Sequence, residues 1–188
     1  MRIITGSAKG TKLKTLDGES TRPTAERVKE AIFSAIQFDL HDRVVLDLFA
    51  GTGQLGIEAL SRGAARAVFV DSDPAAVKLI RGNLELCGYD GAADVYERDA
   101  LVYLEDRGTF DIILIDPPYD TRLAAAAVEK IFEFDKINID GIIVCETRAG
   151  TATPAGPDML FSKKDYRYGG VMITLYERTG VILENSQQ

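Results

Sequence analysis

Residues 44–60 read VVLDLFAGTGQLGIEAL, and this stretch decides the fold. The apolar run at its start is typical of a buried strand, and the glycines after it are typical of a turn. Gly51, Gly53 and Gly56 have the spacing GxGxxG, in which glycines let the backbone turn tightly and approach a ligand closely. The stretch therefore predicts a strand, a ligand-binding turn and a helix over residues 54–61.

The same succession of apolar run, turn and helical segment repeats along the chain. Apolar runs separated by helices indicate a parallel sheet that is covered on both faces. Beyond Gly150 the pattern changes to two runs joined by Gly169 and Gly170, which predicts a closing antiparallel pair. We therefore expect an α/β, Rossmann-like fold with a mostly parallel, seven-stranded sheet. The later strands are expected at AVFVD, DVYER, DIILI, GIIVCE, MLFSKKDYRY and VMITLY.

The segment before this sheet reads as an appendage. Residues 2–16 alternate weakly around Gly6 and Gly10, which predicts a small β-hairpin. The letters TRPT then supply start signals for a helix, and apolar residues at a spacing of four give it one apolar face. We expect residues 1–40 to form a hairpin-and-helix appendage, residues 41–182 a Rossmann-like domain, and residues 183–188 a frayed tail.

Length and composition are those of one globular domain. The chain has 188 residues, 46% of them hydrophobic, and a net charge of −7. No apolar run is long enough to span a membrane, and the N-terminus has no signal-peptide pattern, so we expect a cytoplasmic protein. Cys87 and Cys145 lack metal-ligand spacing and are expected to be reduced thiols.

Acidic residues end successive predicted strands, where ligands bind in such folds. Asp71 lies 20 positions after Gly51, where a carboxylate can accept both hydroxyls of a ribose. A dinucleotide or S-adenosylmethionine would fit this much. Asp47 would repel a pyrophosphate but suits a cationic sulfonium and amino group, so the sequence favours S-adenosylmethionine. Asp99 is expected either at the adenine amino group or as a helix N-cap.

The fourth predicted strand ends in DPPY, residues 116–119. The amino group of a base is a poor nucleophile, because its lone pair is delocalised into the ring. Asp116 and the carbonyl of Pro117 could accept its two hydrogens and free the lone pair for in-line attack on a methyl group. Tyr119 would offer a flat face to an unstacked base. The alternative is a turn that only caps the following helix.

Positive charge is concentrated at the start of the chain. Residues 1–29 carry a net charge of +4, whereas the remainder carries −11. This basic segment is a candidate RNA contact, through Lys9, Lys12, Lys14 and Arg22, or an ordinary solvated face. The single histidine precedes the first strand, away from the expected site, and no metal-ligand spacing occurs, so we expect no metal.

These motifs together resemble the RsmD family of bacterial methyltransferases, which modify the exocyclic N2 of a guanine in small-subunit ribosomal RNA. RIITG combined with TRPT is more specific to that family than the glycine turn or DPPY. The resemblance implies a 16S ribosomal RNA substrate, free or in an assembling subunit, and S-adenosylmethionine as cofactor. A monomer is expected. It implies catalytic residues Asp116, Pro117 and Tyr119, with a cofactor site of Asp47, Phe49, Gly51, Gly53, Asp71, Ser72, Asp99 and Ala100.

Other targets remain open at this point. Adenine N6 in DNA or RNA, or a glutamine side chain in a protein, would present an amino group to the same carboxylate. An NAD-dependent oxidoreductase would use the same glycines, but it leaves Asp47 and DPPY unexplained. A noncatalytic RNA-binding module explains the fewest features.

Overall fold

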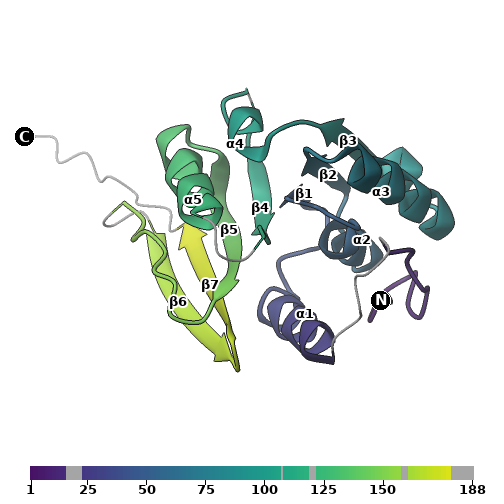
Figure 1. Cartoon of the computed structure of the whole chain (residues 1–188), viewed down its shortest axis with the longest axis horizontal. Coiled ribbons are helices and arrows are strands. Elements are labelled where there is room, and N and C mark those ends of the chain that lie inside the picture. The colour runs from purple at the N-terminus through teal and green to yellow at the C-terminus, as the bar shows by residue number, and fades with distance from the viewer. Residues whose placement is uncertain (16–22, 107, 119–121, 158–160, 179–188) are drawn as a thin grey trace, which may run out of the picture.

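The computed structural model describes residues 1–15, 23–106, 108–118, 122–157 and 161–178 (Figure 1). Its strands form one sheet in the order β3-β2-β1-β4-β5-β7-β6. Strands β1 to β5 are parallel to one another, and β7 is antiparallel to β5 and β6. The predicted mostly parallel, seven-stranded sheet with a closing antiparallel pair is therefore confirmed. The strands are β1 (Val44–Leu48), β2 (Arg66–Asp71), β3 (Ala93–Glu97), β4 (Phe110–Ile115), β5 (Ile137–Arg148), β6 (Phe161–Tyr168) and β7 (Val171–Arg178).

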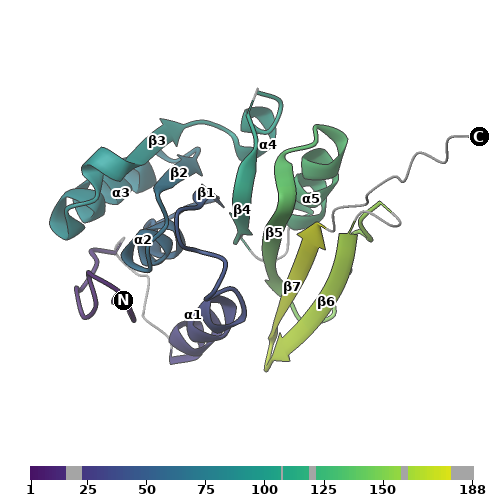
Figure 2. The ribbon, with the colours of Figure 1, turned by 180° about the vertical axis from the view of Figure 1, so that it is seen from behind.

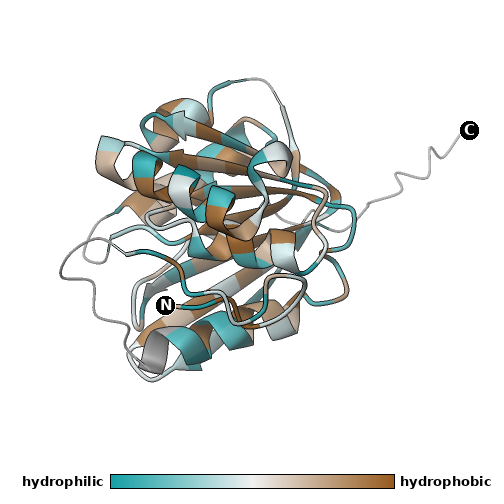
Figure 3. Cartoon of the chain, turned by 90° about the vertical axis from the view of Figure 1, so that its right-hand side faces the viewer, coloured by the Kyte–Doolittle hydropathy of each residue, from teal (hydrophilic) through white to brown (hydrophobic). Residues whose placement is uncertain are grey.

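Helices cover both faces of the sheet (Figures 1 and 2). One core lies between the sheet and α1, α2 and α3, and includes Phe33 and Phe69. The other lies between the sheet and α4 and α5, and includes Leu46 and Val128. Figure 3 shows the hydrophobic strands inside these layers and hydrophilic residues on the outward sides of the helices. The helices are α1 (Pro23–Ala35), α2 (Gln54–Ser61), α3 (Pro74–Cys87), α4 (Ala100–Tyr103) and α5 (Leu123–Glu133), with a 3-10 turn, η1 (Asp90–Ala92).

Local signals explain where the helices begin and end. In α3 the Asp73 side chain accepts a hydrogen bond from the amide of Ala75, and Pro74 occupies the first turn. The helix ends at Gly88, whose φ of 74° is the left-handed conformation that glycine adopts without strain. None of the helices in the described ranges has the length and apolar character needed to cross a membrane.

The N-terminal arm, residues 1–14, folds back on itself and packs on α2. The predicted hairpin is shorter than a regular ladder: it has one antiparallel bridge, Arg2 to Lys12, and a few backbone hydrogen bonds beside it. The arm is nevertheless part of the core, because Ile3 and Leu13 are buried with the α2 side of the sheet.

A buried carboxylate holds the arm in place. Glu58 of α2 is fully buried and accepts hydrogen bonds from the amides of Ile4 and Thr5 at 2.8 and 3.0 Å. Its charge is balanced by Lys29 of α1 at 3.3 Å and by Arg62 at 2.9 Å. Burial lowers the pKa of Lys29, and the nearby Glu58 carboxylate opposes that shift. Two cations and two amides thus satisfy this buried charge.

Candidate active site

The site lies at the carboxyl edge of the parallel strands. Leu48 of β1 is in register with Val70 of β2 and with Ile115 of β4, so the segments that follow these three strands start at the same level. Asp71 is in register with Glu97 of β3, which brings the segment before α4 to the same edge. The topology therefore brings together the ends of β1, β2, β3 and β4, which carry the predicted acidic residues.

The turn after β1 is built from residues with left-handed backbone conformations. Phe49, Gly51 and Gly53 have φ of 59°, 55° and 75°. Glycine adopts such values readily, whereas a bulky residue such as Phe49 does so at a cost and is found there mostly at functional sites. A Cβ on Gly51 would have no neighbour closer than 4.0 Å, so the backbone there is open to a ligand. The turn has the geometry of a binding loop.

Gly56 sets the close approach of α2 to the sheet. A Cβ at this position would lie 2.3 Å from a ring carbon of Phe69, so no larger residue fits without a shift of the helix. Its amide donates a 2.8 Å hydrogen bond to Oδ2 of Asp47 in β1. The third glycine of the motif therefore serves helix packing, and Asp47 fixes the start of α2.

Asp47 is buried to the point that only 1% of its surface is exposed. Its pKa is raised to about 8, chiefly by burial; the hydrogen bond from the Gly56 amide opposes this rise, and the charge of Asp71 adds to it. The side chain is therefore mostly protonated at neutral pH in the ligand-free protein. The expected carboxylate opposite a sulfonium would have to lose this proton when a cationic ligand binds.

Asp71 is held by two backbone amides at the end of β2. Its Oδ2 accepts from Gly51 at 2.8 Å, and its Oδ1 accepts from Asp73 at 2.9 Å. Each carboxylate oxygen can accept more than one hydrogen bond, so both can still receive a ribose hydroxyl. Ser72 beside it is exposed. Two backbone amides thus fix the orientation of this carboxylate, and its contact with a ribose stays a prediction.

Asp99 is the N-cap of α4, which was one of its two expected roles. Its Oδ1 accepts from the amides of Leu101 and Val102 at 2.9 and 3.0 Å. Because both bonds use Oδ1, Oδ2 lies outside this cap. Ala100 is buried directly after it. The adenine contact stays a prediction for Asp99 and for Ala100.

Asp116 and Pro117 follow β4 at the centre of this edge. Asp116 is half-buried, Pro117 is buried and Pro118 is exposed. The predicted target-stacking residue, Tyr119, lies outside the described residues. Burial raises the pKa of the Cys145 thiol to about 12, and the charge of Asp116 contributes to the shift. Cys145 is therefore a buried thiol beside the site, as expected of a core cysteine.

The basic residues expected to contact RNA lie along the N-terminal arm. The amide and carbonyl of Lys14 both bond to Asn83 of α3, which also donates to the carbonyl of Thr52 in the glycine turn. Lys9 lies at the tip of the arm, where the neighbouring backbone contacts Ser61 at the far end of α2. Lys12 pairs with Arg2 between these two ends. Lys14 is thus the predicted contact nearest to the site, and Arg22 lies outside the described residues.

Sequence reasoning missed the polar residues that dock the arm. Glu58 is the single charge in the α2 sequence QLGIEALS, which was a visible signal of a specific partner. Its partners are 53 and 54 positions away for the arm amides, so the sequence could not identify them. No cluster of His, Cys, Asp and Glu able to hold a metal ion is found within the described parts of the chain.

Solved structures with this arrangement include proteins described as methyltransferases. The Escherichia coli protein YhhF, a candidate methyltransferase, matches with a TM-score of 0.85 at 30% identity, over 95% of this chain and 98% of its own. The 16S rRNA N2 G1207 methyltransferase RsmC of Thermus thermophilus, solved with AdoMet and guanosine, shares the fold with a TM-score of 0.69 at 20% identity, over 87% of this chain and 45% of its own. Fold and site define a Rossmann-like methyltransferase.

The relatives narrow this class to one family. The family model "Conserved hypothetical protein 95" matches residues 1–177. YlbH of Bacillus subtilis, a candidate rRNA methyltransferase, is 39% identical over 96% of this chain and 100% of its own. Ribosomal RNA small subunit methyltransferase D of Escherichia coli K12 is 32% identical over 95% of this chain and 90% of its own. The chain belongs to this family, the RsmD family that the motifs resemble.

Proposed function

We propose that the protein transfers a methyl group from S-adenosylmethionine to the exocyclic N2 of a guanine in small-subunit ribosomal RNA. The observation that carries the proposal is the placement of Asp116 and Pro117 at the same edge as the glycine turn and Asp71. The names of the relatives support ribosomal RNA as the substrate. Ribosomal RNA is found in the bacterial cytoplasm, which we propose as the location.

The residues present fit the cofactor. Asp71 is fixed by the Gly51 amide and can also accept a ribose hydroxyl, and the turn at Gly51 leaves room for close approach. The protonated Asp47 can release its proton beside a cation. In this arrangement Asp71 would hold the ribose, Asp99 and Ala100 the adenine, and the turn from Phe49 the methionine portion. When bound, S-adenosylmethionine supplies an electrophilic methyl group.

The chain's own residues would then prepare the nitrogen. The Asp116 carboxylate accepts a hydrogen bond from one N–H of the amino group, and the carbonyl of Pro117 accepts a hydrogen bond from the other. Proline carries no amide hydrogen and fixes φ, so Pro117 is restricted to presenting a carbonyl. Two acceptors favour a pyramidal nitrogen, whose lone pair is no longer delocalised into the ring. Tyr119 would support the base from its face.

Analysis of modified nucleosides tests this function directly. Small-subunit RNA from a bacterial strain that lacks this protein is incubated with the enzyme and S-adenosylmethionine, and the nucleosides are identified by mass spectrometry. N2-methylguanosine is expected. Detection of N6-methyladenosine would mean that the target is adenine, and the absence of any methylated nucleoside would refute RNA methylation.

The role of Asp116 has its own prediction. Asp116→Ala should lower kcat by about 100-fold or more while the Kd for S-adenosylmethionine changes little, because the carboxylate acts on the amino group and not on the cofactor. Asp94→Asn, a surface carboxylate on β3, is the matched control and should turn over normally. Near-normal kcat for Asp116→Ala would refute the amino-group mechanism.

A further inference from the structure

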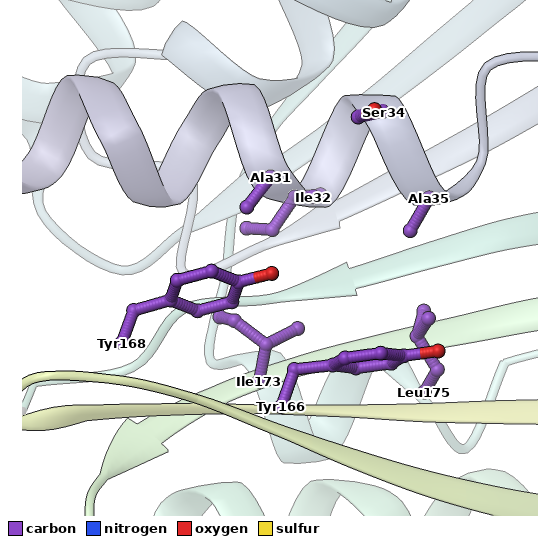
Figure 4. A pocket seen from close by; sticks show the side chains of 8 residues that line it. All are labelled: Ala31, Ile32, Ser34, Ala35, Tyr166, Tyr168, Ile173 and Leu175. Atoms are coloured by element: carbon purple, nitrogen blue, oxygen red, sulfur yellow. The ribbon is translucent and has the colours of Figure 1, made fainter.

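A groove separates α1 from the hairpin formed by β6 and β7. Its cavity volume is about 320 Å³. Figure 4 shows two tyrosine rings, from Tyr166 and Tyr168 of β6, side by side below α1. The residues that line the groove are Ala31, Ile32, Ser34, Ala35, Tyr166, Tyr168, Ile173 and Leu175.

The tyrosines present an aromatic surface to solvent. The exposed fractions of Tyr166 and Tyr168 are 39% and 37%. The α1 residues across from the rings include Ala31 and Ala35, whose small side chains leave space above them (Figure 4). Rings exposed over an open, apolar space suit a flat ligand, because bases stack on aromatic faces with little regard to sequence.

The register of the sheet relates this surface to Asp116. Ile115 of β4 pairs with Cys145 of β5, so Asp116 is level with Glu146. Glu146 pairs with Ile173 of β7, and Ile173 pairs with Tyr166 of β6. The three strand spacings between Asp116 and Tyr166 add to roughly 14 Å. A short stretch of unstacked RNA can span that separation.

Positive charge flanks the rings at the end of the groove nearest to the site. Arg27 is exposed on α1, four positions before Ala31 and on the same side of the helix. Arg148, also exposed, ends β5 and shares its row across the sheet with Val171 and Tyr168. Glu146 is on the same face but is half-buried. Aromatic faces bordered by arginines are suited to a single-stranded nucleic acid.

We infer that this groove binds nucleotides that flank the target guanine, with bases stacked on Tyr166 and Tyr168 and phosphates close to Arg27 and Arg148. The inference rests on the proposed function and adds the path of the RNA. The strand would cross the sheet from Asp116 toward β6, on the side of β4 opposite to the N-terminal arm. The arm and the groove would then hold RNA on both sides of the reacting base.

Substitutions of the two tyrosines test the groove. Tyr166→Leu and Tyr168→Leu keep apolar bulk but remove the ring, and each should raise the Kd for a naked 16S RNA fragment by about 10-fold. Tyr166→Phe and Tyr168→Phe keep the ring and should bind as the wild type does. Tyr96→Leu, on β3 at the other end of the sheet, is the matched control, since Tyr96 is 45% exposed, and RNA affinity should not change.

The outcomes distinguish this inference from the proposed function. If both Leu variants fold, as verified by circular dichroism, and bind RNA with unchanged affinity, the inference that the groove binds RNA is overturned. A loss seen only with assembled subunit particles would also overturn it and would indicate a protein partner. Ring-dependent RNA binding without methylation of any RNA would support the groove while refuting the proposed reaction.

Photocrosslinking gives a readout that is independent of affinity. Trypsin should release Tyr166 in the peptide DYR and Tyr168 in YGGVMITLYER. Ultraviolet light applied to the complex of wild-type protein and RNA should attach nucleotides to these two peptides. Crosslinks confined to other peptides would overturn the inference.

Discussion

At the scale of the residue, Asp71 combines an expected contact with the cofactor ribose and a structural role. It accepts the amides of Gly51 and Asp73, and so connects the glycine turn to the start of α3. We expect Asp71→Ala to weaken S-adenosylmethionine binding by about 1.5 to 3 kcal/mol or more, because the ribose partner and the support of the turn are lost together. Isothermal titration calorimetry measures this change.

The adjacent carboxylate provides the control for Asp71. Asp73 caps α3, so Asp73→Ala should cost about 1 kcal/mol of folding stability with little effect on cofactor affinity. If both variants bind S-adenosylmethionine as tightly as the wild type does, Asp71 is not a ribose ligand.

Asp47 should make the free energy of unfolding depend on pH. Its pKa is about 8 in the folded chain against 3.8 for a free side chain, so the folded state holds the extra proton between these values. The contribution of Asp47 to stability therefore falls as pH rises from about 4 to 8. Asp47→Asn cannot ionise, and between pH 5 and pH 8 its stability should fall less than that of the wild type, by a few kcal/mol. Urea denaturation at both pH values measures the difference, and parallel pH profiles would contradict the prediction.

At the scale of the element, the docking of the N-terminal arm on α2 depends on Gly6. A Cβ at Gly6 would lie 1.6 Å from the carbonyl oxygen of Ser61, and Gly6 has a φ of 90°. Gly6→Ala should therefore displace the arm and destabilise the protein by about 3 kcal/mol or more. Gly10→Ala is the control: its φ of 87° is similar, but a Cβ there meets nothing within 4 Å. It should cost only the backbone strain, about 1 to 2 kcal/mol.

Thermal and urea denaturation of the two variants separate the cost of the contact with Ser61 from the cost of backbone strain. Equal losses of stability for Gly6→Ala and Gly10→Ala would mean that the contact with Ser61 contributes little. Proteolysis of the arm, faster in Gly6→Ala alone, would report its release from α2.

Sequence patterns predicted elements well where one local signal dominates. The apolar run at β1 and the glycines after it located α2 at Gln54–Ser61, and Gly169 with Gly170 located the turn between β6 and β7. The weak alternation of residues 2–16 predicted a hairpin, but only one bridge forms, because the arm bonds mainly to α2 and α3. Those bonds join residues distant in sequence, and a local pattern does not contain them.

The candidate site was predictable for a similar reason. Each acidic residue follows an apolar run, and the parallel topology brings the ends of such runs to one edge. The groove at Tyr166 and Tyr168 was not predicted, since alternating residues on β6 gave no indication of the helix that would face them. The burial of Asp47 was likewise not predicted, whereas the cap formed by Asp99 was one of its two expected roles.

At the scale of the whole molecule, the uneven charge should govern how RNA binding responds to salt. The chain carries −7 overall, with a net charge of +4 over residues 1–29. Changing Lys9, Lys12 and Lys14 together to Ala should weaken RNA binding and flatten the slope of log affinity against log salt by up to about 2 units. Filter binding at several salt concentrations measures this slope.

Cofactor affinity is the internal control for the lysine variant. Lys14 is bonded to Asn83 through its backbone, which an alanine retains, so the Kd for S-adenosylmethionine should not change. An unaltered salt slope with full activity would mean that the arm is a solvated face and that RNA docks by other residues.

The position of β6 at the end of the sheet has a consequence for self-association. Among the strands of the described residues, β6 has a neighbour on one side only, and an open strand edge is a template for pairing with another chain. Lys163, Lys164 and Arg167 line this strand, and a second β6 aligned with it would bring like charges together. The charges on β6 therefore oppose edge-to-edge polymerisation of the protein, and replacing them with valine would favour fibrous aggregates.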